Sequence, residues 1–281
     1  MARHEAPSPP AQAHPSAILE GDVELAPGVE VGPGCVIRGR VRIGAGTKLL
    51  GQVWLQGPLT LGARNTIYPF SALGFAPQHL DWDPDRDGAG LQIGDDNVIR
   101  ESVTFSRAAS DEAPTRIGSG TYWMANSHAG HDCQVGDRCV IANGVLLGGS
   151  VQVGEDVVIG GNVSVHQHTR LGRGALLSGS FGLNKDLPPF FMLTGTNICG
   201  SMNITGMRRA GMPHDQIDDV RWVFKTLYRK GLPLKRALEE LQARADRPRV
   251  AEYLDFLAGM KRGLCPTRGD PRRGAIADDP S

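Results

Sequence analysis

The sequence has no excess of charge of either sign. It carries 30 lysine and arginine residues against 30 aspartate and glutamate residues, and charged residues make up only 21% of the 281 positions. Long runs of one sign are absent. Binding to a phosphate backbone depends mainly on positive charge, so this composition argues against a nucleic-acid partner.

Cysteine is also scarce, and its spacing is not that of a disulfide framework. The five cysteines are odd in number, and Cys35, Cys133 and Cys139 fall within apolar repeats, where cysteine acts as a small buried residue. We expect free thiols in a reducing compartment, the cytoplasm. Residues 1–15 are rich in Pro and Ala and contain no long apolar run. They predict a disordered tail without a signal peptide, and we expect no membrane insertion.

What the sequence does have is an apolar residue at every sixth position. The register begins with Leu19, Leu25, Val31, Ile37, Ile43, Leu49, Leu55, Leu61, Ile67 and Leu73, continues at Ile93, Ile99 and Phe105, and resumes from Ile117 to Leu183. A step of six walks around the surface of a helix, whereas a solenoid buries each repeat against its neighbours. The pattern predicts a three-sided prism of parallel strands, in which coils stack about 4.8 Å apart.

Glycine often follows the apolar residue of a repeat, as at Gly32, Gly44, Gly118 and Gly136. Glycine adopts backbone angles that other residues resist. We therefore expect these glycines to form the corners of the prism by virtue of their conformational freedom.

Two polar segments and a change of period divide the chain. Residues 74–92 and 106–116 interrupt the repeat and predict projecting loops. The solenoid is expected to end near Leu187, followed by a linker, after which the period becomes helical, with Pro213 and Pro233 at helix starts. The sequence thus predicts a disordered tail (1–15), a mainly β domain, a parallel β-helix of hexapeptide repeats (16–203), a small C-terminal α-helical domain (204–263) and a second disordered tail (264–281).

The densest group of reactive side chains is the segment 126–133, which contains His128, His131 and Asp132. A carboxylate beside an imidazole raises its basicity and fixes its orientation. Gly149 follows His131 by 18 residues, one coil further along the same edge, with a backbone N–H that no side chain hinders. A base and an N–H donor on one groove wall are what acyl transfer to a hydroxyl needs.

Other interpretations of these residues remain open at this point. Surface histidines are often only solvated polar residues. His128, His131 and Cys133 would scatter as metal ligands, because side chains alternate along a strand. Cys133 as a nucleophile is disfavoured because its position in the repeat recurs at Cys139. Arg208 and Arg209 fit either a charged helix face or a phosphate contact. We expect no metal and no cofactor.

Five longer motifs carry a resemblance to a known family: IRESVT (99–104), ANSHAGHDC (125–133), IGGNVSVHQ (159–167), DLPPF (186–190) and NITGMRRAG (203–211). Over nearly its whole length the chain closely resembles the bacterial acyl-ACP–UDP-N-acetylglucosamine O-acyltransferases, which carry out the first step of lipid A synthesis. The resemblance implies a left-handed β-helix and a homotrimer with active sites between subunits. It also implies acyl carrier protein as the acyl donor and UDP-N-acetylglucosamine, or a related nucleotide sugar, as the acceptor.

The resemblance further implies roles for individual residues. His131 matches the general base, Asp132 its acidic partner and Gly149 the oxyanion-hole glycine. Residues that match contacts to the nucleotide sugar, its uridine and its phosphates are Gln78, His128, His166, Gln167, Asn203 and Arg209. Gly179 matches the position that limits acyl chain length, and a glycine there implies room for a long hydroxyacyl chain.

The chain also departs from the family pattern, mainly on the side expected to bind the nucleotide sugar. The usual aspartate–leucine–lysine of the first loop is His79-Leu80-Asp81, and other departures are Ser150, Thr205 and Ala210. Three hypotheses follow: the lipid A enzyme itself, a diverged paralogue that acylates another hydroxyl or an amine, or a non-catalytic trimeric β-helix.

Overall fold

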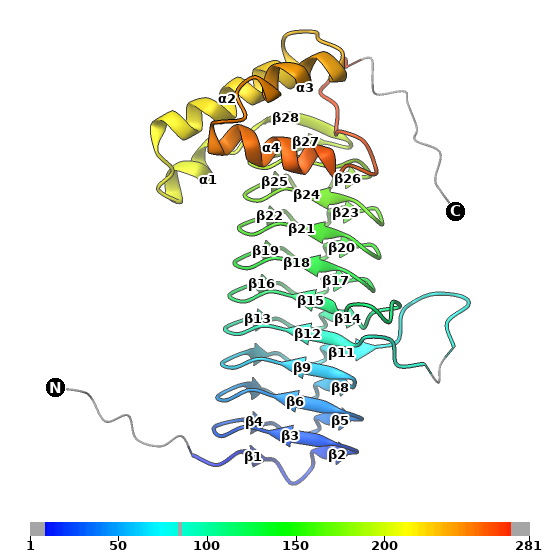
Figure 1. Cartoon of the computed structure of the whole chain (residues 1–281). Coiled ribbons are helices and arrows are strands. Elements are labelled where there is room, and N and C mark those ends of the chain that lie inside the picture. Colours follow the sequence, from blue (N-terminus) through cyan, green and yellow to red (C-terminus); the bar gives the residue numbers. More distant parts are fainter. Residues whose placement is uncertain (1–8, 84–85, 271–281) are drawn as a thin grey trace, which may run out of the picture.

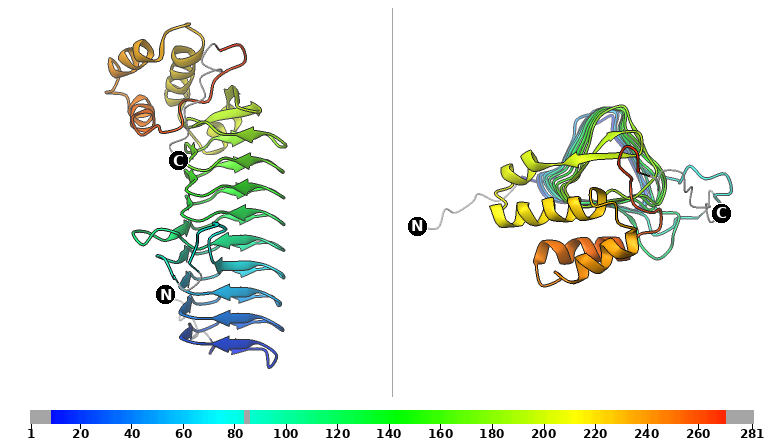
Figure 2. Two further views of the ribbon diagram at one scale, coloured as in Figure 1. Left: turned by 90° about the vertical axis from the view of Figure 1, so that its right-hand side faces the viewer. Right: turned by 90° about the horizontal axis from the view of Figure 1, so that it is seen from above.

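The protein is a three-sided prism of short parallel strands with helices at one end. The computed structural model describes residues 9–83 and 86–270. Viewed along its axis the prism is triangular (Figure 2), and from the side the coils stack from the N-terminal end to the helices (Figure 1). This architecture confirms the predicted parallel β-helix of hexapeptide repeats.

Within the described residues each side of the prism is one sheet. Face A comprises β1 (Gln12–Ala13), β4 (Glu30–Val31), β7 (Lys48–Leu49), β10 (Thr66–Ile67), β13 (Val98–Ile99), β16 (Tyr122–Trp123), β19 (Val140–Ile141), β22 (Val158–Ile159), β25 (Leu176–Leu177), β27 (Phe191–Gly195) and β28 (Ile198–Met202). Face B comprises β2 (Ile18–Glu20), β5 (Val36–Arg38), β8 (Trp54–Gln56), β11 (Ala72–Phe75), β14 (Thr104–Ser106), β17 (His128–Ala129), β20 (Leu146–Leu147), β23 (Ser164–Val165) and β26 (Gly182–Leu183). Face C comprises β3 (Val23–Leu25), β6 (Val41–Ile43), β9 (Leu59–Leu61), β12 (Leu91–Ile93), β15 (Thr115–Ile117), β18 (Gln134–Val135), β21 (Gln152–Val153) and β24 (Arg170–Leu171).

The six-residue register is the inward-facing column of each face. On face B, Ala129 pairs with Leu147 and Leu147 with Val165, and all three are buried. Successive apolar residues therefore stack on one another along the prism axis, and they fill its interior together with a second buried residue two positions earlier in many repeats, such as Cys133 before Val135 and Val145 before Leu147. Each coil contributes one residue of this register to each face, which is why the period is so regular.

The glycines after the apolar residues serve a different purpose from the predicted one. The left-handed backbone angle falls two residues later, for example at Asp132 (φ 60°), Arg138 (φ 57°) and Asn162 (φ 56°). Glycine itself is needed because adjacent coils approach closely: a Cβ at Gly118 would lie 2.6 Å from the Gly136 carbonyl carbon. The expectation of unusual backbone angles at these glycines was wrong, and close contact between coils explains them.

The outward-facing residues differ from face to face. On face C they are polar throughout: Glu24, Arg42, Thr60, Gln92, Arg116, Gln134, Gln152 and Arg170. On the half of face A nearer the helices they are apolar or aromatic: Val98, Tyr122, Val140, Val158, Leu176 and Met192. Face C is therefore suited to exposure to solvent, whereas this part of face A is suited to burial against another protein surface.

Two loops leave the prism, as predicted, between β11 and β12 and between β14 and β15 (Figure 1). The strands on either side of each loop still stack in register: Thr66 pairs with Val98, and Thr104 with His128. The loops are joined to each other, because the Ala89 N–H donates to the Ser110 carbonyl (2.8 Å) and Arg86 pairs with Asp111.

The ends of the prism differ from the expected boundaries. β1 pairs with β4, so the solenoid begins within the segment predicted to be a tail. At the other end, β27 and β28 form an antiparallel hairpin that extends face A where a linker was expected after Leu187. Residues 264–270 are also ordered against the prism: Cys265 is fully buried, and its N–H donates to the Asp186 carbonyl (2.8 Å). The rest of the predicted tails, residues 1–8 and 271–281, lies outside the described residues.

The C-terminal domain is helical, as its 3.6-residue period indicates. It contains α1 (Ile204–Arg209), α2 (His214–Tyr228), α3 (Leu234–Gln242) and α4 (Pro248–Ala258). Pro213 and Pro233 immediately precede α2 and α3, as predicted. Phe191 of the last coil packs against Phe224, Tyr228 and Tyr253, which joins the helices to the prism. None of the helices in the described part of the chain is long and apolar enough to cross a membrane.

Candidate active site

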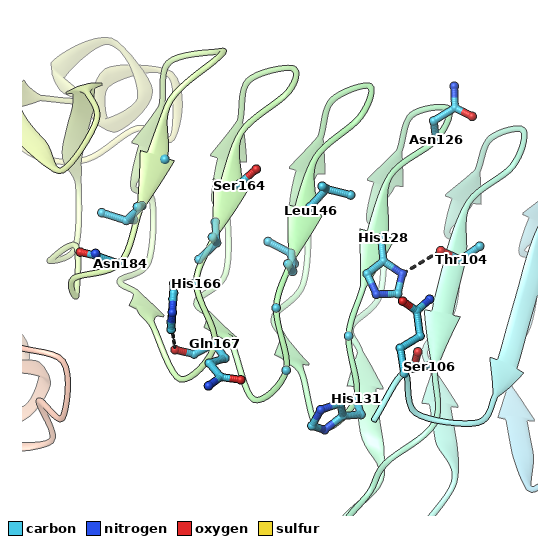
Figure 3. A pocket seen from close by; sticks show the side chains of 18 of the residues that line it. Thr104, Ser106, Asn126, His128, His131, Leu146, Ser164, His166, Gln167 and Asn184 are labelled. Atoms are coloured by element: carbon cyan, nitrogen blue, oxygen red, sulfur yellow. Dashed lines mark hydrogen bonds between the residues drawn. The ribbon is translucent and has the colours of Figure 1, made fainter. Parts of the chain in front are cut away.

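A groove of about 820 Å³ runs along the outer side of face B. Its floor is formed by the outward residues of successive strands, from Thr104 through His128, Leu146 and Ser164 to Gly182 (Figure 3). Gln78, on the first loop, lines the same groove.

His131 lies at the corner that follows β17. Its Nδ1 is 2.6 Å from Asp132 Oδ2, and its side chain remains partly exposed. A carboxylate accepts hydrogen bonds, so Nδ1 carries the proton and Nε2 carries the lone pair. The Nε2 atom is directed toward the neighbouring coil, where an added Cβ at Gly149 would lie only 2.6 Å from it. His131 is thus oriented as a base whose free nitrogen faces the groove.

Asp132 is held by more than its histidine. Its Oδ1 accepts the Ser110 N–H (3.0 Å), and its own N–H donates to Thr115 Oγ1 (2.8 Å). Burial raises the pKa of the Asp132 carboxyl, but the hydrogen bonds from His131 and the backbone outweigh burial and lower it overall. Asp132 is therefore ionised near neutral pH and suited to stabilising a protonated His131.

Gly149 occupies the next coil at the same corner as His131. The Ser150 N–H donates to the His131 carbonyl (2.8 Å), which stacks the two corners directly. Among the described residues, the Gly149 N–H donates to no acceptor. A base nitrogen and a free N–H therefore sit side by side on one wall, as predicted from the 18-residue spacing.

The remaining polar residues of the groove surround this pair. Thr104 Oγ1 is 2.7 Å from His128 Nδ1, and burial lowers the pKa of His128, so His128 is a neutral donor or acceptor near pH 7. His166 and Gln167 lie two coils above His131 at the same corner, with His166 Nδ1 3.2 Å from the Gln167 carbonyl (Figure 3). Polar side chains thus flank the catalytic candidates on both sides.

The chain is similar to several known proteins. Residues 186–265 match the family model described as UDP-N-acetylglucosamine O-acyltransferase, domain 2, and residues 114–149 match the six-repeat bacterial transferase hexapeptide model. A curated acyl-acyl-carrier-protein–UDP-N-acetylglucosamine O-acyltransferase from Halorhodospira halophila is 39% identical over 254 residues, which is 89% of this chain and 98% of that protein. The corresponding protein from Thermodesulfovibrio yellowstonii is 35% identical over 255 residues, 90% of this chain and 98% of that one.

This chain belongs to the acyl-acyl-carrier-protein–UDP-N-acetylglucosamine O-acyltransferase family. Solved structures agree. The UDP-N-acetylglucosamine O-acyltransferase of Moraxella catarrhalis superposes with a TM-score of 0.85 at 34% identity, covering 90% of this chain and 99% of that one. The Francisella novicida enzyme gives a TM-score of 0.88 at 29% identity, covering 95% of this chain and 100% of that one. The chain is thus an acyltransferase, which sets aside the hypothesis of a non-catalytic β-helix.

Not every residue matched to the family motifs lies in the groove of a single chain. Asn203 is a structural N-cap: its Oδ1 accepts the Gly206 N–H (2.9 Å), and its Nδ2 donates to the Gly174 carbonyl (3.0 Å). Arg209 is exposed at the end of α1 and lines no part of the groove. Gly179 lies at the other corner of face B, where an added Cβ would be 3.0 Å from the Gly161 carbonyl oxygen.

Cys133 has no place in the chemistry of the groove. Its side chain is fully buried, and burial raises the pKa of its thiol to about 12. The thiolate required of a nucleophile or a metal ligand is therefore strongly disfavoured. Because Cys133 faces the interior while His128 and His131 line the groove, the three side chains do not converge.

Three residues that hold His128 or Asp132 in place were not predicted from the sequence: Thr104, Ser110 and Thr115. Thr104 was detectable in principle, because the hexad register resumes after the second loop and places it one coil below His128. Ser110 and Thr115 belong to that loop, or to the strand that follows it, and their contacts with Asp132 depend on how the loop folds back. The six-residue period does not predict how this loop folds back.

Proposed function

We propose that this protein transfers a 3-hydroxyacyl group from acyl carrier protein to the 3-hydroxyl of UDP-N-acetylglucosamine, the first step of lipid A synthesis. The observation that carries the proposal is the placement of the His131 imidazole between Asp132, which lies 2.6 Å from Nδ1, and Gly149, where an added Cβ would lie 2.6 Å from Nε2. Family membership supplies the substrates, since the relatives are named for acyl carrier protein and UDP-N-acetylglucosamine.

The reaction follows from the placement of these groups. His131 Nε2 removes the proton of the acceptor hydroxyl as its oxygen attacks the thioester carbonyl carbon of the donor. The Gly149 N–H stabilises the negative charge that develops on the carbonyl oxygen. Asp132 stabilises the imidazolium formed in this step. Collapse of the tetrahedral intermediate breaks the carbon–sulfur bond, and the imidazolium returns its proton to the departing thiolate of the carrier protein.

We further propose that the active unit is a homotrimer in the cytoplasm. The groove is lined by face B, by Gln78 of the first loop and by Thr196 and Asn197 of the turn between β27 and β28, and the adjoining face A carries an outward apolar column along the same coils. Contact between face A of one copy and face B of the next is a head-to-tail interface, which closes into a ring. Such a neighbour is also what would bring Arg209 and Gly179 toward a groove they do not line within one chain. All five cysteines are buried, and Cys35, Cys133 and Cys139 are free thiols, which suits a reducing compartment.

Gly179 remains the candidate for the end of the acyl site. Replacing it with methionine should shift the preference toward shorter donors, because each methylene excluded from the site forfeits about 0.8 kcal/mol. Since a Cβ at this position already approaches the Gly161 carbonyl, thermal unfolding of the variant should be measured alongside its donor profile.

The direct test is incubation with 3-hydroxyacyl carrier proteins of several chain lengths and UDP-N-acetylglucosamine, with products identified by mass spectrometry. A monoacylated UDP-sugar, formed by the wild type and lost in His131→Ala, is the expected result. Hydrolysis of the donor without acylation of the sugar would contradict the assignment of the acceptor.

One observation favours a second candidate, a paralogue with a different hydroxyl or amine acceptor. The first loop reaches the groove through Gln78, and its next residues, His79 and Asp81, replace the acidic and basic residues usual there. The charges beside the proposed acceptor site therefore differ from those usual in the family. If UDP-N-acetylglucosamine is the acceptor, Asp81→Lys should lower its KM, because an acidic side chain repels a diphosphate. An unchanged KM, together with acylation of another acceptor, would favour the paralogue.

A further inference from the structure

The two loops that leave the prism both contribute to the groove. Each runs from a strand of face B to a strand of face C, so both lie along the corner that also carries His131 (Figure 1). The first loop supplies Gln78 to the groove wall, and the Ser110 N–H of the second loop donates to Asp132 Oδ1 (3.0 Å). The relative position of the two loops therefore affects both the groove wall and the Asp132 carboxylate.

Arg107 lies where the two loops meet. It is only 5% exposed, and its guanidinium donates to the carbonyl of Arg86 (3.0 Å) and, at a longer distance, to that of Gly74 (3.4 Å). Gly74 is in β11, from which the first loop departs, and Arg86 is on the arm of the loop that returns to the prism. The Arg107 N–H also donates to the Phe75 carbonyl (2.9 Å). One residue of the second loop thus binds both arms of the first.

The shape of the guanidinium is what allows it to bind both arms. Its Nη2 donates to Arg86 and its Nη1 to Gly74, so the two bonds use different branches of a rigid fork. The ring of Trp82 lies beside the same group, with its centroid 6.0 Å from Arg107 Cζ. A lysine ammonium has neither the fork nor the flat face. We therefore expect lysine to be a poor substitute for Arg107.

A closed path of bonds leads from Arg107 to Asp132. Arg107 holds the Arg86 carbonyl, and three residues further on, the Ala89 N–H donates to the Ser110 carbonyl (2.8 Å). Ser110 in turn uses its own N–H for Asp132. The path is closed because Ser110 follows Arg107 by only three positions in the chain. A displacement of the returning arm would therefore also displace the donor that holds Asp132.

We propose that Arg107 is a positioning residue that acts through Ser110: it ties the returning arm of the first loop to the second loop and so keeps the Ser110 N–H on Asp132, and Asp132 directed at His131. This proposal rests on the proposed function, because it assumes that His131 and Asp132 are the catalytic pair. A displacement of about 1 Å at reacting groups can lower a rate by about 10²-fold. The fold itself should persist without the tie, because residues of the coils fill the interior of the prism.

The kinetic test compares Arg107→Ala and Arg107→Lys with Arg116→Ala. Arg116 is a matched control, because it is an exposed arginine of β15 on face C, just after the second loop. Both changes at Arg107 should lower kcat by about 10- to 10²-fold, with melting temperatures close to that of the wild type. Guanidinium ions, at concentrations too low to denature the protein, should restore part of the rate in Arg107→Ala by occupying the vacated space. Arg116→Ala should keep the wild-type kcat and show no such response.

Hydrogen exchange tests the same tie without turnover. The Ser110 amide should be protected in the full-length wild type and in Arg116→Ala, and it should exchange faster in both Arg107 variants. Unchanged protection of Ser110, or an unchanged kcat, in Arg107→Ala would overturn the proposal. If Arg107→Ala proves too unstable to compare, Arg107→Lys, which keeps the charge and most of the side chain, decides by the same two measurements. Failure of the wild type to acylate UDP-N-acetylglucosamine would overturn the proposed function instead, and the exchange rates would still show whether Arg107 holds Ser110.

Discussion

Faces B and C are built from the same repeat and yet differ in everything that points outward. Their inward residues are equally buried, for example Leu147 on face B and Val153 on face C. Outward, face C presents an unbroken column of polar side chains, whereas the upper part of face B is a groove lined by histidines, small residues and the first loop. The inward column therefore determines the fold, and the outward column and the loops determine what each face does.

The largest expected effect is a difference in turnover between a substitution at the corner after face B and a substitution at the corner after face C. His131 and Asp137 occupy equivalent turn positions one hexad apart. His131→Ala should reduce turnover by about 10²–10⁴-fold, because it removes a positioned base. Asp137→Ala loses only a hydrogen bond to the Ser119 N–H and should retain near-normal turnover. Steady-state rates and thermal unfolding of both variants check this; comparable losses in the two would contradict the assignment of the active corner.

The second prediction concerns Gly149, which occupies in the following coil the turn position that His131 occupies. Glu155 and Arg173 occupy this position at the corner after face C, so a side chain there is compatible with the turn. In Gly149→Ala the new Cβ would meet His131 Nε2 instead of solvent. We expect a decrease in kcat of about 10²-fold, with an unchanged melting temperature, because the base is displaced from its oxyanion donor. Wild-type kcat in this variant would remove Gly149 from the site.

The third prediction compares the effect on trimer assembly of a substitution on face A with that of a substitution on face C. Val158 is 37% exposed in the apolar column of face A, and Gln152 lies in the polar column of face C. Val158→Glu places a charge where we propose a neighbouring copy packs, and it should convert trimers into smaller species in sedimentation velocity at micromolar concentration. Gln152→Glu should sediment as the wild type does. A trimer that tolerates both changes would show that face A is not the covered surface.

The smallest effect is on stability and depends on pH. The pKa of Asp132 is lowered in the folded protein, so its ionised form adds stability above the unfolded value of about 3.9, and this contribution is lost as the pH falls through the folded value. Asp132→Asn should therefore lower the free energy of unfolding by about 1 kcal/mol at pH 7. The difference in melting temperature should narrow below about pH 4. A difference that stays constant across this range would mean that the carboxylate charge is irrelevant.

The sequence predicts the interior of this protein better than its edges. The apolar period locates Leu147, Val165 and their equivalents because each coil must bury one such residue on each face. The N-terminal boundary was wrong because β1 is held by backbone pairing, which leaves no apolar signature. Cys265 was likewise assigned to a tail, because a single small residue that covers the end of a solenoid has no periodic partner.

The same contrast applies to the site. His131, Asp132 and Gly149 could be placed together from the coil length alone, since residues 18 apart stack on one corner. Asn203 could not be placed from the sequence, because an amide in a family motif reads the same whether it binds a ligand or caps a helix. The bonds from Ser110 and Thr115 to Asp132 depend on the path of the second loop, which no repeat constrains.

The two loops leave the stacking of the strands unchanged. An uninterrupted coil separates stacked residues by 18 positions, but across the first loop the separation is 32 and across the second it is 24. Each loop therefore starts and ends at neighbouring points on the prism, and doubling its length adds only about 0.6 kcal/mol of closure entropy. Such loops can be replaced without changing how the coils stack. A descendant of this protein could change its acceptor by exchanging residues 76–90 alone, without altering the prism that holds His131.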